Sequence, residues 1–120
     1  MTEIKWYLEK DSFGICANGH ADYNPGNDIV CSAVSALLQT VYAGLELFCG
    51  TAVDQEQESG SFVLEGRMDS EGARVLFDST LFGLGLIERE YPDNVRIERV
   101  GAGFSPLHGG GGNPFSTLLQ

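Results

Sequence analysis

The pattern of apolar and polar residues along the chain predicts four β-strands. The first two strands extend from Ile4 to Leu8 and from Phe13 to His20, and the turn residues Asp11-Ser12 between them indicate a hairpin. The other two segments with this character are Ser61 to Met68 and Val95 to Val100. Residues 54–60 carry three acidic side chains among seven, so this segment is predicted to be a solvated loop.

Two longer segments have the three- and four-residue spacing of helices. The first extends from about Ile29 to Phe48, with Asp28 as its expected N-cap and Gly50 as its expected C-cap. Its apolar positions are Val30, Val34, Leu37, Leu38, Val41, Leu45 and Phe48. The second helix is predicted from about Glu71 to Tyr91, with glycines at positions 83 and 85 that weaken its middle.

The order of these elements, β-β-α-β-α-β, predicts an α+β fold. A four-stranded, mainly antiparallel sheet with both helices packed on one face suits that order. Residues 1–100 then form one domain. Residues 101–120 are glycine-rich and cannot pack a core of their own, so they are expected to be a flexible C-terminal tail.

Charge narrows the classes of partner. The 120 residues include 17 acidic and 7 basic side chains, which gives a formal net charge of -10. Nucleic-acid binding is therefore not expected, and a basic protein or peptide is the better electrostatic partner. The chain has no apolar run of about 18 residues and no signal-like start, so neither a membrane span nor export is expected. Three widely spaced cysteines fit free thiols in the cytoplasm.

The candidate chemistry lies at the start of the first helix. Cys31 follows the cap Asp28 by three residues, and a helix N-terminus stabilises a thiolate, the nucleophilic form of cysteine. His20 ends the second strand just before the connecting loop, so its ring can reach Cys31 as a base. The first-turn N–H groups are candidate oxyanion donors. Ser35 lies one turn after Cys31 on the same helix face.

Each of these residues also has an ordinary structural reading. A cysteine in a helix is most often a small core residue, and Asp28 is more simply an N-cap than an orienter of His20. A metal or redox role for Cys16, His20 and Cys31 stays open, because Cys16 and His20 are four apart on the predicted strand. No convincing fourth zinc ligand is present, so neither a metal nor another cofactor is expected.

The sequence around these residues resembles the ribosomal-processing cysteine protease family Prp. The family pattern is G-H-A, a short loop, then G-x-D-[IV]-[VI]-C-A-x-V-S. It corresponds here to Gly19-His20-Ala21 and to Gly26-Asn27-Asp28-Ile29-Val30-Cys31-Ser32-Ala33-Val34-Ser35. Two departures are Ser32, where the family has alanine, and the tail after residue 100.

The resemblance implies a cysteine endopeptidase with His20 and Cys31 as its catalytic dyad and Asp28 and Ser35 in supporting roles. It implies removal of the N-terminal extension of a basic ribosomal protein of the L twenty-seven type, with a cut after an aromatic pair and before a small residue. It also implies a homodimer and a mobile substrate loop, made of Asp22, Tyr23, Asn24, Pro25, Gly26 and Asn27. Tyr23, Tyr42 or Phe82 are expected to line an apolar groove. The alternative is a non-catalytic ribosome-associated binding domain of the same fold.

Overall fold

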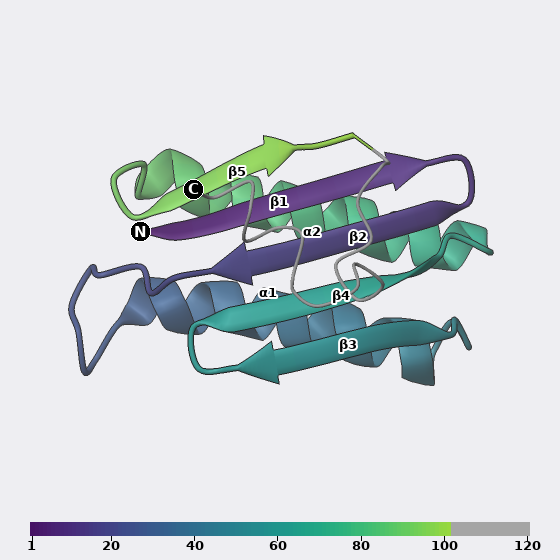
Figure 1. Ribbon diagram of the computed structural model, residues 1–120, viewed down its shortest axis with the longest axis horizontal. Helices are drawn as coiled ribbons and strands as arrows, with labels where there is room; N and C mark the ends of the chain where they lie inside the picture. The colour runs from purple at the N-terminus through teal and green to yellow at the C-terminus, as the bar shows by residue number, and fades with distance from the viewer. Residues whose placement is uncertain (102–120) are drawn as a thin grey trace, which may run out of the picture.

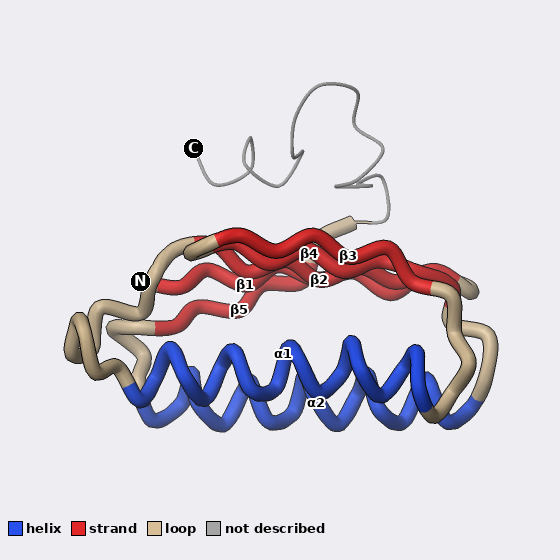
Figure 2. The backbone as a smooth tube through the Cα atoms, turned by 90° about the horizontal axis from the view of Figure 1, so that it is seen from below, coloured by secondary structure: helices blue, strands red, loops and turns tan. Residues whose placement is uncertain are grey.

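The computed structural model describes residues 1–101, which form a sheet layered on a pair of helices (Figure 1). The elements in chain order are β1 (Thr2–Glu9), β2 (Ser12–Asn18), α1 (Ile29–Leu47), β3 (Val53–Glu58), β4 (Ser61–Arg67), α2 (Glu71–Glu90) and β5 (Val95–Arg99). Both helices cover the same face of the sheet, as predicted (Figure 2). The expected tail lies outside the described residues, apart from Gly101.

The sheet is mixed and has five strands in the order β3-β4-β2-β1-β5. The pairs β1–β2, β2–β4 and β3–β4 are antiparallel, whereas β1 and β5 are parallel. The parallel pair follows from the connection, because α2 carries the chain from β4 past β2 and β1 to the far edge of the sheet. The β2 strand is thus central, and its C-terminal end leads directly to α1.

The core lies between the sheet and the helices. Phe77 of α2 is its aromatic centre, with ring centroids 5.0 Å from Phe13 and 6.2 Å from Trp6. The two helices approach closely where Gly44 of α1 faces Leu76, because an added Cβ would lie 2.6 Å from a Leu76 methyl carbon. Gly83 of α2 lies at the same contact between the helices and faces Leu37 of α1. This glycine was expected to weaken α2, but because it has no side chain it leaves room for Leu37.

The prediction of four strands was wrong, because residues 53–58 form β3. This strand has only one apolar residue, Val53, and its side chains are otherwise acids and amides. An edge strand can be polar on both faces, so the alternation that marks a half-buried strand is missing. The end of β2 was also misplaced, since the strand stops at Asn18 and His20 lies beyond it.

The helix α1 is long and apolar enough to cross a membrane by length and composition alone. Its apolar stripe packs against the sheet instead, which is the behaviour of a core helix. The buried members of that stripe are Val30, Val34, Leu38, Val41 and Leu45. The helix begins at the expected cap Asp28, but its C-cap is Phe48 rather than Gly50.

Replacing Phe77, which is 1% exposed, tests the position of the core. Phe77→Ala is expected to lower the free energy of unfolding by about 3–5 kcal/mol, because it leaves a cavity beside two other rings. The matched control is Phe48→Ala at the end of α1, 88% exposed, which should change stability by less than about 0.5 kcal/mol. Urea denaturation measures both, and equal losses would contradict this packing.

Candidate active site

The site begins where the chain leaves β2. Gly19 has a φ of 89°, in the left-handed region, and this turn takes His20 out of the sheet. The Gly19 N–H donates to the Gly60 carbonyl at 2.8 Å, which ties the turn to the β3–β4 hairpin. A Cβ on Gly60 would lie 3.2 Å from His20 Nε2, so the imidazole rests against a residue without a side chain. The hairpin therefore supports the His20 ring.

Asp28 organises the loop and the helix start together. One carboxylate oxygen accepts the N–H groups of Val30 and Cys31, both at 3.0 Å. The other oxygen accepts the N–H groups of Tyr23 at 2.9 Å and Asn24 at 3.3 Å. These hydrogen bonds, that from Cys31 first, hold the Asp28 pKa below its usual 3.8, so the carboxylate is ionised at neutral pH. Asp28 is the N-cap, and it makes no hydrogen bond to His20.

The Cys31 sulfur has a backbone donor of its own. The Ala21 N–H donates a hydrogen bond to Sγ at 3.1 Å. Ala21 is held in turn by the Asn94 side chain, whose Nδ2 donates to the Ala21 carbonyl at 2.9 Å. Asn94 follows α2, and its own carbonyl accepts the Thr2 N–H at 2.8 Å. Sequence reasoning missed Ala21 and Asn94, because neither role has a local sequence signal.

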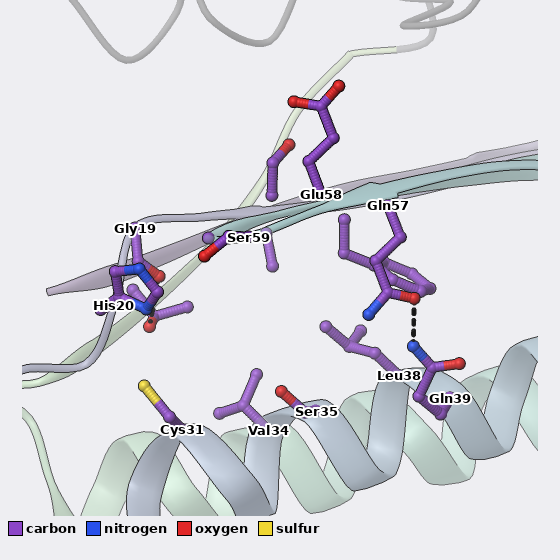
Figure 3. A pocket seen from close by; sticks show the side chains of 15 residues that line it. Gly19, His20, Cys31, Val34, Ser35, Leu38, Gln39, Gln57, Glu58 and Ser59 are labelled. Atoms are coloured by element: carbon purple, nitrogen blue, oxygen red, sulfur yellow. Dashed lines mark hydrogen bonds between the residues drawn. The ribbon is translucent and has the colours of Figure 1, made fainter. Parts of the chain in front are cut away.

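His20 and Cys31 lie at the junction of two cavities. The imidazole lies above the sulfur across the mouth of the first cavity (Figure 3), and no hydrogen bond joins them. The first cavity has a volume of about 210 Å³ and the second about 410 Å³, and both residues line both cavities. Thiol–imidazole contacts are often long in unliganded sites, so this separation is compatible with a dyad.

The first cavity lies between α1 and the β3–β4 hairpin. Its apolar wall includes Val34, Leu38 and Phe62, and Ser35 lies on the same wall as Cys31. At its far end Gln39 donates a hydrogen bond to Gln57, which links the helix to β3 (Figure 3). The expected aromatic lining was wrong. Neither Tyr42 nor Phe82 lines either cavity, and Tyr23 packs against Tyr91 with ring centroids 5.1 Å apart.

The second cavity lies between the start of α1 and the expected substrate loop. Asp22, Pro25 and Gly26 line it, together with Asp28 and Ser32 of the helix start. Asn24 and Asn27 bond to one another across the turn of the loop, and Asp22 accepts the N-terminal ammonium at 3.1 Å. The loop is therefore next to Cys31, as its position in the sequence suggested.

The expected oxyanion donors are already engaged. Asp28 accepts the N–H groups of Val30 and Cys31 through its carboxylate, and its carbonyl accepts the Ser32 N–H at 3.1 Å. The first turn of α1 thus contributes its dipole to the site, while these three N–H groups are occupied by the cap.

The structure does not bring the proposed metal or redox trio together. Cys16 is fully buried on the sheet face away from the helices, where it packs with Tyr7 and Val63. Burial raises the pKa of its thiol to about 12, which leaves it inert. Because the strand ends before His20, the four-residue spacing no longer sets a shared face. Within residues 1–101 no cluster of three metal-ligating side chains occurs.

Similar folds occur among solved structures. The ribosomal processing protease Prp from S. aureus, with a covalently linked product peptide, has a TM-score of 0.76 and 23% identity, covering 83% of this chain and 100% of that chain. The same protein with a substrate peptide has a TM-score of 0.70 and 22% identity over the same shares. The protein SMU.848 from Streptococcus mutans has a TM-score of 0.67 and 23% identity, with coverage of 83% and 97%. At these identities the likeness shows the fold.

The family of the chain is shown by the match of its sequence to a family model. None of the curated proteins matches the chain significantly. A family model described as cysteine protease Prp, however, matches residues 1–96, which include every element described above except the last residues of β5. The chain therefore belongs to the Prp family of cysteine proteases.

Proposed function

We propose that this chain is a cysteine endopeptidase in which Cys31 is the nucleophile and His20 the general base and acid. The observation that carries the proposal is the surroundings of the Cys31 sulfur. It lies at a capped helix N-terminus, receives the Ala21 N–H at 3.1 Å and faces His20 across the mouth of a cavity. Those are the conditions under which a thiol becomes an effective nucleophile.

The chemistry divides into two steps. The Cys31 thiolate attacks the substrate carbonyl carbon, and the protonated imidazole of His20 gives its proton to the departing amine, which leaves a thioester on Sγ. His20, now neutral, takes a proton from water as the water attacks the thioester. The thiolate then leaves, and His20 keeps the proton for the next cycle. Ser35, on the wall of the first cavity, is positioned to hydrogen-bond the substrate backbone.

The proposed substrate is the N-terminal extension of a ribosomal protein of the L twenty-seven type, cut after an aromatic pair and before a small residue. Two of the similar structures are described as a ribosomal processing protease with product or substrate peptide, which supports this class of substrate. The charge of -10 suits a basic ribosomal protein. The apolar wall of the first cavity suits an aromatic side chain.

We also propose a cytoplasmic homodimer. Three free cysteines suit a reducing compartment. For the dimer, α2 offers an exposed apolar stripe on its outer side, formed by Val75, Phe82 and Leu86, which are 57%, 70% and 47% exposed. These residues have helical spacing, and a second copy would cover them.

A peptide with a Phe-Phe-Ala junction followed by basic residues tests the dyad. Wild type should cut it before the alanine, Cys31→Ala should not cut it, and His20→Ala should lose about 10²–10⁴-fold in kcat/KM. Cys49→Ala, which removes a thiol outside both cavities, is the matched control and should retain activity. Mass spectrometry identifies the products. Peptide binding without cleavage by folded wild type would instead support the non-catalytic binding domain.

Asn94 is predicted to position the site through Ala21. Asn94→Asp keeps the shape of the side chain but removes the donor, so the Ala21 N–H should lose its fixed direction. We expect kcat/KM and the rate of Cys31 alkylation by iodoacetamide to fall together, by about tenfold. The exposed neighbour Asp93→Asn is the control for a charge change nearby. Unchanged alkylation in a folded Asn94→Asp protein would show that Asn94 does not act on the sulfur.

A further inference from the structure

The strand β3 offers an unpaired edge beside the active site. Within residues 1–101 it pairs only with β4, and it is the outermost strand on its side of the sheet (Figure 1). Its last residues, Gln57 and Glu58, border the first cavity together with Ser59 of the following turn. An edge strand has free backbone donors and acceptors, and an extended peptide can bind to them. This edge therefore leads directly to the cavity that contains Cys31.

The two faces of β3 are chemically different. The side chain of Gln57 points toward the helices, where it bonds to Gln39 of α1 (Figure 3). Gln55 donates a hydrogen bond to Gln57 on the same face. The alternate residues Asp54, Glu56 and Glu58 are exposed on the opposite face. Neither the Glu56 nor the Glu58 carboxylate takes part in a hydrogen bond or ion pair with the described part of the chain. Carboxylates two residues apart on a strand recur about every 6.8 Å.

In a strand added to this edge, alternate side chains would point to the same two faces as the side chains of β3. Side chains that point toward the helices would lie beside Gln57 and Gln39 at the end of the first cavity, whose apolar wall is formed further in by Val34 and Leu38. Side chains that point the other way would lie beside Glu56 and Glu58. Because the repeat of an extended peptide equals that of β3, alternate basic residues would align with the carboxylates.

We propose that β3 binds an extended segment of the substrate as a sixth strand, with apolar side chains toward the first cavity and basic side chains toward Glu56 and Glu58. This inference rests on the proposed function and adds the surface that binds the substrate segment. Charge on an edge strand commonly prevents unwanted pairing, but negative charge repels acidic strands and attracts basic ones, and a neutral strand gains no such attraction. The acidic edge thus selects its partner.

The test compares peptides with the same Phe-Phe-Ala junction and the same composition. In two of them lysine alternates with leucine, placed either before or after the junction, and in the scrambled controls the lysines are adjacent. The proteins are wild type, the double variant Glu56→Gln/Glu58→Gln, and the matched control Glu46→Gln/Glu90→Gln, which removes two exposed charges from the helices. A further peptide carries N-methyl groups on alternate backbone amides of the alternating segment.

We expect one of the two alternating peptides to bind along β3. For that peptide the double variant should raise KM about three- to tenfold with kcat unchanged, and added salt should raise the KM of wild type in the same way. The helix control should not raise KM, and N-methylation should raise KM for wild type. Equal KM values for the alternating and scrambled peptides, on either side of the junction, would overturn the inference. So would a change of sedimentation in the free double variant, which would make the edge an interface between two copies.

These outcomes are separate from those that test the proposed function. If wild type cuts the peptides and Cys31→Ala does not, the endopeptidase stands whatever the KM values show. If wild type cuts none of them, the proposed function fails first.

Discussion

The carboxylate of Asp28 is the constraint on which the candidate active site depends. It accepts four backbone N–H groups, two from the loop after β2 and two from the first turn of α1. One side chain therefore sets both the start of the helix that carries Cys31 and the path of the loop that follows His20. An ionised acceptor makes these bonds stronger than a neutral cap would.

The remainder of the fold supplies rigid supports for that arrangement. The β3–β4 hairpin holds the His20 ring through Gly60, and the end of α2 holds Ala21 through Asn94. The residues at the site thus come from three parts of the chain that are distant in sequence: the segment from β2 to α1, the β3–β4 hairpin and the turn after α2. The core formed around Phe77 fixes those parts relative to one another, so the stability of the core and the geometry of the site are linked.

Much of the fold and part of the candidate site were predictable from local sequence patterns. Both helices, four of the strands and the Asp28 cap have signals within a few residues, and the loop and helix start between His20 and Cys31 led to the prediction that these two residues form a pair. The strand β3 could not be found, because a polar edge strand has no alternation. Asn94 could not be found either, since its contact with Ala21 spans 73 residues. The separation of Cys16 from His20 depended on where β2 ends, which sequence placed two residues too late.

The most direct test of Cys31 as the nucleophile is to trap the acyl-enzyme during turnover. Wild-type protein mixed with the Phe-Phe-Ala peptide would be quenched in acid within the first turnovers and measured as intact protein and as proteolytic fragments by mass spectrometry. The proposed mechanism predicts an added mass equal to that of the N-terminal product less one water, located on the fragment that contains Cys31. Cleavage with no adduct on Cys31, or with the adduct on Cys16 or Cys49, would contradict it.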